Sequence, residues 1–429
     1  MKHHGPLRRA RAILALPLLL AAAGSAWLPG IAQAQAQAQT SPYRLGVSQS
    51  LMHDSNLLRA GEGQLLPEGL RRSDTVSSTA LILALDQPIS RQRLGVDATL
   101  RANRFAHNKR YDNEGYNLRA VLDWATVERL GGSLQASRNR TLARFAGAED
   151  GLSTERNTEQ TTRLAASAYY GLAGPYRLEA GLERSTVGYS SERYRRREFE
   201  QDSASFGLRW RPSDGLNLRL ALRHTAGSYP HYLIASDGSS HGDDFRRQAL
   251  ELSGEWIPSA ASRVRARLSQ GRTRYDIARE RDESGLTGEV GWTWQPAGRF
   301  SLVTTLRRQP AQDAYLLDTS GELGSIEYSR MSSVLALRAG YQLSAKLALQ
   351  AEWEHTQRRL ERTLYLGGLG ADSRAARDHD NTLRLSASWQ AQRSLNLGCD
   401  WQRFSRSASD LFLAQRSNAF SCWGQFMLQ

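Results

Sequence analysis

Alternation of apolar and polar residues with a period of two constrains this chain most, and from Ser90 it recurs almost to the end. In 93–101, Leu, Val, Ala and Leu fall on one face and Arg, Gly, Asp, Thr and Arg on the other, and 216–223 and 263–268 repeat the pattern. Such alternation is typical of β-strands with one apolar and one polar face. No helical stretch intervenes that could cover an open sheet, so the pattern predicts an all-β fold.

The connections between the expected strands alternate between short and long. The short ones lie near 87–88, 126–130, 172–175, 212–215, 257–262, 296–298, 342–345 and 391–394; the long ones lie near 54–73, 106–115, 146–158, 190–199, 226–243, 276–284, 309–328, 361–379 and 406–417. Outer-membrane barrels combine short periplasmic turns with long extracellular loops. We therefore expect a transmembrane antiparallel β-barrel of about 18 strands. Sixteen is the alternative, because alternation is weak in the first and fifth strands.

Aromatic residues and prolines support this register. An aromatic residue stands on the apolar face just before most short turns, namely Trp124, Tyr170, Trp210, Trp256, Trp294, Tyr341 and Trp389. Together they predict an aromatic girdle at one bilayer interface. The twelve prolines fall in turns, in expected loops or at or before the first strand. None therefore interrupts an expected spanning strand, where its missing N–H would break the hydrogen-bonded ladder.

Composition excludes several other classes of protein. Beyond the N-terminus no apolar run approaches the ~20 residues of a membrane-spanning helix, and apolar residues are spread too evenly for a disordered chain. The two cysteines exclude a disulfide framework or a zinc-finger cluster. The low mean hydropathy of −0.53 suits a barrel, since only alternate residues meet lipid. In hydrocarbon, strands must close into a barrel so that every backbone group is paired.

The N-terminus predicts export. Residues 1–34 read as a signal peptide, with four basic residues, an apolar stretch over 13–23 and an Ala-Gln-Ala cleavage site at 32–34. The barrel then comprises 35–429, and we expect it in the bacterial outer membrane. Removing the signal peptide leaves 52 − 43 = +9 charges. The basic residues are dispersed along the chain rather than gathered in a patch, so nucleic acid is not an expected partner.

Arginine dominates the face expected to line the lumen. The candidate pore-lining, substrate-guiding residues are Arg101, Arg119, Arg177, Arg219, Arg223, Arg263, Arg265 and Arg267. A guanidinium group offers a planar fork that suits carboxylate and phosphate, so unpaired arginines would favour anionic solutes. The alternative is an Arg/Glu ladder that only holds the wall together, since Glu251 and Glu255 lie on the strand before Arg263–Arg267.

Cys399 and Cys422 are candidates for a disulfide. A hairpin centred between residues 410 and 411 places them directly opposite each other. Cross-strand neighbours have Cβ atoms about 4.5–5.5 Å apart, and the periplasm is oxidising. The alternative is two small apolar residues that face lipid.

Other candidate sites are weaker. His224 and His355 have no Ser or Asp partner at a recognisable spacing, and no nucleophile or metal motif is present, so we expect no catalytic residue, metal or cofactor. The segment 236–244 is rich in oxygen ligands but lacks the spacing of a calcium loop. The arginine-rich segment 192–197 is either a solvated loop or a site for lipopolysaccharide phosphates or an emerging acidic polymer.

The segment that follows the first expected strand, His53-Asp54-Ser55-Asn56-Leu57-Leu58-Arg59, carries a family resemblance. Together with the closing segment 420–429, it resembles the exosortase-associated exopolysaccharide biosynthesis protein of the EpsL type, within the broader β-barrel porin group. The resemblance makes Asp54, Ser55, Asn56 and Leu57 the family motif. It implies a role in polysaccharide secretion and biofilm formation, with an exopolysaccharide chain, outer-membrane lipid and lipopolysaccharide, and periplasmic polysaccharide-export components as partners.

The leading hypothesis from the sequence is an outer-membrane channel that exports an acidic exopolysaccharide through an arginine-rich, hydrated lumen. A general or anion-selective porin for small solutes is the closest alternative, because the same charge bias would serve it. An outer-membrane enzyme acting on lipid or sugar ranks third.

Overall fold

A computed structural model describes residues 41–428 apart from 144, 146–153, 173, 235–238, 297, 320–321 and 367–368. The expected signal peptide, residues 1–34, lies outside the described residues. The strands are β1 (Tyr43–Asp54), β2 (Asp74–Ile89), β3 (Gln92–Phe105), β4 (Asn113–Ala125), β5 (Leu130–Leu142), β6 (Thr158–Gly171), β7 (Tyr176–Tyr189), β8 (Phe199–Ser213), β9 (Leu216–Ile234), β10 (Ser240–Ser259), β11 (Ser262–Tyr275), β12 (Glu283–Trp294), β13 (Phe300–Thr319), β14 (Glu322–Gln342), β15 (Leu347–Leu366), β16 (Leu369–Gln390), β17 (Leu395–Arg406) and β18 (Gln415–Leu428).

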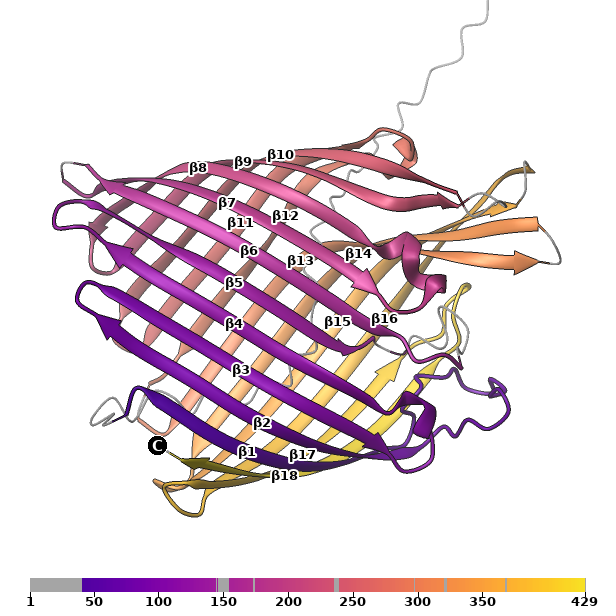
Figure 1. The fold of residues 1–429 in the computed structure, drawn as a ribbon, viewed down its shortest axis with the longest axis horizontal. Coiled ribbons are helices and arrows are strands. Elements are labelled where there is room, and N and C mark those ends of the chain that lie inside the picture. The colour runs from indigo at the N-terminus through magenta and orange to yellow at the C-terminus, as the bar shows by residue number, and fades with distance from the viewer. Residues whose placement is uncertain are drawn as a thin grey trace, which may run out of the picture.

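The strands form one antiparallel sheet that closes on itself (Figure 1). Each strand pairs with the next along the chain, and Leu45 of β1 lies opposite both Leu83 of β2 and Leu428 of β18. The expected barrel of 18 strands is thus confirmed over the alternative of 16, since β1 and β5 are fully paired strands. A barrel of this strand number is wide enough to enclose an aqueous lumen.

The period of two gives the barrel wall two different faces. On β9 and β10, Leu222 and Leu250 are 65% and 46% exposed on the outer face. Arg223 and Glu251, which directly follow these leucines in sequence, point inward and contact each other. Successive side chains of a strand project to opposite sides, so one register places the leucines outside and the charges inside.

The two ends of the barrel differ as expected, but three connections at the loop end are not loops. We expected loops over 226–243, 309–328 and 361–379; instead β9–β10, β13–β14 and β15–β16 continue as paired hairpins through most of these residues. Figure 1 shows the orange β13–β14 hairpin extending past the barrel wall. Pro230 and Pro310, expected in loops, therefore lie in strands. These segments have a loop-like composition because both faces of a ribbon beyond the bilayer can be polar.

Short 3₁₀ helices order other connections at the loop end. The helix η1 (Lys109–Tyr111) follows β3, and the Asp74 carboxylate accepts hydrogen bonds from the backbone N–H groups of His107 and Asn108 at 3.0 and 2.7 Å. Tyr111 packs in a buried apolar cluster beneath the loop. Burial raises the pKa of its phenol, against a smaller opposing effect of Arg110, which favours the neutral ring.

The connection that follows β11 repeats this construction. The Asp243 carboxylate accepts hydrogen bonds from the N–H groups of Ile277 and Ala278 at 2.8 and 3.2 Å, just before the helix η3 (Arg279–Arg281). A third helix, η2 (Glu192–Arg197), contains the arginine-rich segment and packs against β7, β9 and β13. The loop end is thus built from folded connections that rest on the barrel wall.

Candidate functional site

Arginines on the inner face of β7–β11 form the most strongly charged part of the lumen. We call this set the arginine wall; its eight members are Arg177, Arg209, Arg219, Arg223, Arg247, Arg263, Arg265 and Arg267. Four glutamates, Glu179, Glu183, Glu251 and Glu255, are interspersed with them on the same face, and Glu183 pairs with Arg163 of β6 at 2.6 Å. Among these twelve side chains the balance is 8 − 4 = +4.

Glu179 is the centre of the first group. Its carboxylate accepts hydrogen bonds from Arg177 Nη2 and Arg209 Nε, both at 2.5 Å, and from Arg219 Nε at 2.8 Å. The side chain is only 12% exposed. Three guanidinium groups thus share one carboxylate, and hydrogen bonds to charged groups are the strong ones.

Glu251 is the centre of the second group and is more deeply buried, with its side chain 4% exposed. Arg223 Nε donates to it at 2.7 Å and Arg267 Nη2 at 3.3 Å, while Arg219 Nη1 approaches to 3.9 Å. Arg219 therefore links the two groups. Arg247, buried beside them, donates from Nη2 to Ser269 Oγ at 3.2 Å.

The triplet on β11 is more open to the lumen than the rest. Arg265 Nε lies 2.5 Å from Glu255 Oε2 and Arg263 Nε 3.9 Å from the same atom. The Arg263, Arg265 and Arg267 side chains are still 47%, 69% and 50% exposed. The triplet is thus both paired, as the alternative interpretation held, and able to present guanidinium donors to a solute.

The remaining predicted pore-lining residues lie elsewhere. Arg101 and Arg119 are exposed on the inner face of β3 and β4, well away from the wall in strand order. Among the described residues neither has an ion pair. Sequence reasoning therefore named six members of the arginine wall and gave Arg209 and Arg247 no special place; their position on the same alternating face was the available signal.

The inner face of β14–β17 differs from the arginine wall because its charges are matched. Arg338 pairs with Glu352 at 3.0 Å. Arg358 pairs with Asp378 at 2.8 Å and with Asp380 at 2.6 Å, and Asp380 also accepts from Arg406 at 3.0 Å. The inner face of β7–β11 therefore carries a larger positive excess than that of β14–β17.

The aromatic residues expected as a girdle lie on the outer face at the short-turn end. Trp210 is directly opposite Tyr176 and Leu218 on the adjacent strands, and Trp389 is opposite Leu347. Six of the seven are exposed there: Tyr170, Trp210, Trp256, Trp294, Tyr341 and Trp389. Trp124 is half-buried on the same face.

The two cysteines lie opposite each other on the outer face of β17 and β18. Their Cα atoms are 4.0 Å apart, and the structure joins them in a disulfide. The bridge lies outside the lumen, so it holds the last hairpin together without lining the candidate site.

The segment 54–57, singled out in the sequence as a motif, connects the first strand to the last. The buried Asp54 carboxylate accepts a hydrogen bond from Ser417 Oγ of β18 at 2.7 Å and pairs with Arg59 at 2.9 Å. The backbone N–H of Asn418 donates to Ser55 Oγ, and Asn56 Nδ2 donates to the Arg416 carbonyl oxygen. Leu57 packs in the apolar cluster around Tyr111. The motif is thus a clasp at the loop end of the closing seam.

Other groups weighed from the sequence are not assembled into a centre. Within the described residues no group of three or more His, Cys, Asp or Glu side chains could hold a metal ion, and part of the segment 236–244 lies outside them. His355 Nδ1 is within 2.9 Å of Asn381 Oδ1, and His224 lies on the outer face. Across the described ranges no helix is long and apolar enough to cross a membrane.

The closed sheet, its apolar outer face, the aromatic residues at one end and the charged lumen define an outer-membrane β-barrel. The protein is located in the bacterial outer membrane, with the short turns in the periplasm and the loop end outside the cell.

Comparison with solved structures found several similar chains, all at low sequence identity. The chain is similar to OccK2 (OpdF) of Pseudomonas aeruginosa, with 12% identity over 90% of this chain and 97% of that one and a TM-score of 0.47. It is similar to OpdK of the same organism, solved with vanillate, with 10% identity, coverage of 90% and 98% and a TM-score of 0.44. The FrpB iron transporter of Neisseria meningitidis gives 8% identity, coverage of 90% and 81% and a TM-score of 0.45. No family model and no curated protein matches the chain.

Proposed function

We propose that this barrel is a channel for acidic carbohydrate and that its cargo is an exopolysaccharide moving to the cell surface. The observation that carries the proposal is the arginine wall, in which arginines outnumber glutamates by eight to four on one sector of the lumen. A solute carboxylate that enters this sector meets guanidinium donors with few competing acceptors. Each guanidinium has five N–H donors. A carboxylate that several arginines share cannot accept all of their hydrogen bonds, so donors remain for a solute.

The β11 triplet suits a long anionic chain better than a single ion. Arg263, Arg265 and Arg267 stand at alternate positions of one strand, so they repeat about every 7 Å along it. A polymer with regularly placed carboxylates can pass from one to the next without leaving the wall. Exposed ion pairs are individually weak, roughly 0–1 kcal/mol, which allows release as well as binding.

The family resemblance of the motif at Asp54–Leu57 supports polysaccharide as the cargo. The second candidate function, an anion-selective porin for small solutes, is favoured by the same arginine wall. The two functions differ in what must cross the membrane and in which direction.

Deletion of the gene separates them. The export proposal expects loss of surface polysaccharide and its accumulation in the periplasm, restored by the wild-type gene. Unchanged surface polymer together with reduced uptake of small anions would overturn export and support the porin.

Conductance of the purified barrel tests the wall directly. In planar bilayers, oligouronates should block the current at lower concentration than neutral glucans of equal length. Replacing Arg263, Arg265 and Arg267 with Gln should reduce that preference. Equal block by charged and neutral oligosaccharides would contradict the proposed role of the arginines.

A further inference from the structure

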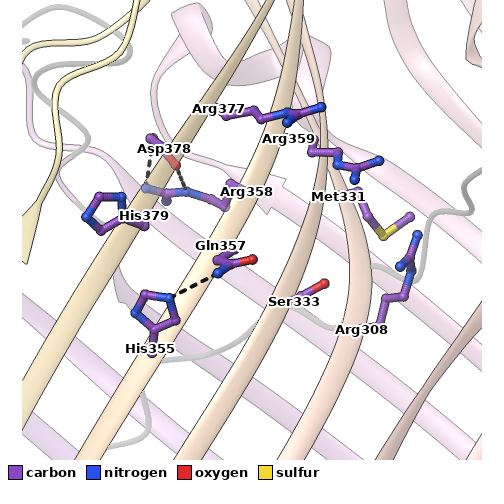
Figure 2. Close-up of a pocket in the computed structure, with 10 residues that line it drawn as sticks. All are labelled: Arg308, Met331, Ser333, His355, Gln357, Arg358, Arg359, Arg377, Asp378 and His379. Carbon is purple, nitrogen blue, oxygen red and sulfur yellow. Dashed lines mark hydrogen bonds and ion pairs between the residues drawn. The ribbon is translucent and has the colours of Figure 1, made fainter.

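A second group of arginines lies on the outer face of the barrel, where β13–β16 approach the loop end (Figure 2). A pocket there is lined by Met331, Ser333, His355, Gln357, Arg358, Asp378 and His379 together with three exposed arginines, Arg308, Arg359 and Arg377. We call this group the outer patch. In Figure 2, Arg359 and Arg377 lie close together, and Arg308 and Arg359 lie on either side of Met331.

The pairing of the strands brings these cations together. Arg359 of β15 is directly opposite Arg377 of β16, and Arg308 of β13 shares a row with Ser333, Gln357 and His379. All three arginines are exposed. Across the part of the chain that the structure describes, none of the three has an ion pair. Like charges opposite each other destabilise a sheet, so this arrangement favours an anion in the pocket.

Among the described residues, the acids near the outer patch form no ion pair with its arginines. Glu361 stands one outward position beyond Arg359 on β15 and accepts a hydrogen bond from Ser373 Oγ at 3.4 Å. Arg358 and Asp378, each adjacent in sequence to a residue of the outer patch, point inward and pair at 2.8 Å. Asp380 also faces the lumen, where Arg358 and Arg406 bind it. The period of two therefore turns Asp378 and Asp380 inward. Asp378 contributes to the lining of the pocket, but its side chain is fully buried and bound by Arg358.

The outer patch lies at the height of the outer lipid headgroups. The apolar band of such a barrel is about 25 Å tall and its strands tilt by about 40°, so about ten residues span it at ~3.3 Å each. On β16, Trp389 marks the periplasmic girdle, and His379 lies 389 − 379 = 10 residues away. Arg377 lies one outward position further.

Apolar side chains lie directly below. Leu335 is opposite Leu306 and His355, and Trp353 stacks on His355 with ring centroids 6.0 Å apart. A ligand whose anionic groups contact the arginines and whose hydrocarbon lies against these apolar side chains would match both parts of this surface. Phosphate is the anion best suited to converging guanidinium groups.

We propose that the outer patch binds the phosphorylated glycolipid of the outer leaflet, lipopolysaccharide. Its lipid A phosphates contact Arg308, Arg359 and Arg377, and its acyl chains lie against Leu306, Leu335 and Trp353. This site is distinct from the arginine-rich segment 192–197 and does not depend on the cargo of the lumen.

Other outward arginines extend the same belt. Arg246 and Arg274 are directly opposite each other on β10 and β11, and within the described residues neither has an ion pair. Arg184 on β7 is different, because Glu200 and Asp202 of β8 lie at 3.0 and 3.4 Å. The sector β7–β8 therefore serves as an internal contrast to the outer patch.

The test uses the full barrel in nanodiscs and measures retention of bisphosphorylated lipid A by native mass spectrometry. Replacing Arg308, Arg359 and Arg377 with Gln should weaken retention on the order of tenfold, as expected for three exposed charge contacts. The matched control replaces Arg263, Arg265 and Arg267 with Gln, removing the same charge from the lumen, and should retain lipid A as the wild type does.

Dephosphorylated lipid A and inorganic phosphate identify the recognised group. The wild type should retain dephosphorylated lipid A no better than the outer-patch variant retains the phosphorylated form, and millimolar inorganic phosphate should compete poorly because it lacks acyl chains. Equal retention by wild type and variant, with both barrels resistant to SDS before heating, would overturn the proposal. Equal retention of both lipids by the wild type would overturn it as well.

Discussion

Arg358 and Arg359 are adjacent in sequence, yet they have opposite surroundings. Arg358 points into the lumen and pairs with Asp378 and Asp380, whereas Arg359 points outward beside Arg377. Arg246 and Arg247 on β10 show the same division. Inner arginines of the wall share carboxylates, and arginines of the outer patch have none among the described residues. Arginine in the lumen thus holds the wall together and faces the solute. Arginine on the outer face is available to bind a lipid phosphate.

The largest effect should come from removing an acid on which the inner arginines depend. Glu251→Gln leaves Arg223 and Arg267 without their shared carboxylate at a site only 4% exposed, and we expect a loss of about 3 kcal/mol in the free energy of unfolding. Glu289→Gln is the control, since this carboxylate is 50% exposed and, among the described residues, its ion pair is with Arg307; its loss should be below about 1 kcal/mol. Urea unfolding in detergent, followed by tryptophan fluorescence, measures both. Equal losses would show that sharing does not stabilise the wall.

A smaller effect is expected on ion selectivity, which should depend on the arginines of the lumen and not on those of the outer patch. Replacing the β11 triplet, Arg263, Arg265 and Arg267, with Gln should lower the anion-to-cation permeability ratio roughly threefold, or about 0.7 kcal/mol, the size of partly screened charge effects. The same replacement at the outer patch should leave the ratio unchanged. Reversal potentials in a salt gradient give the ratio. A change from the outer patch, or none from the triplet, would contradict the division into faces.

The smallest effect concerns the outer patch without its ligand. In detergent free of lipopolysaccharide, Arg377→Gln should stabilise the barrel by a few tenths of a kcal/mol, because it removes a like charge opposite Arg359. Arg184→Gln should instead cost a few tenths, since it loses Glu200 and Asp202. Added lipid A should reverse the sign for Arg377 alone. A destabilising effect of Arg377→Gln in detergent would mean that the outer patch is not strained by its own charge.

Much of the fold was predictable because a barrel wall is a repeated local pattern. The alternation of apolar and polar residues predicted the two faces of the wall, and the positions of the short turns predicted the number of strands. The same register placed Trp210 and Trp389 at the short-turn end of the barrel. The three extended hairpins were missed, since beyond the bilayer neither face needs to be apolar and the alternation disappears. Treating 361–379 as a loop also hid the outer patch, which requires Arg377 and His379 on a strand.

The sequence predicted which side of the wall the charged residues of the candidate site face, but not which of them form ion pairs. The sequence placed Arg219, Arg223 and the β11 triplet in the lumen. The symmetry of one hairpin set Cys399 opposite Cys422 but did not decide between a disulfide and two small residues facing lipid. It could not show that Glu179 gathers Arg177, Arg209 and Arg219 from three adjacent strands. Such contacts depend on rotamers and on strand stagger, which local periodicity does not encode.

The sequence by itself determined a closed all-β wall with an apolar outside and a charged inside, because hydrocarbon leaves strands no other way to pair their backbone groups. Only the tertiary structure decided which of these charges pair. The stagger of neighbouring strands sets which arginine meets which carboxylate, so it gathered arginines around Glu179 and Glu251 and joined Arg358 to Asp378. The same stagger left Arg359 opposite Arg377 at the height of the lipid headgroups.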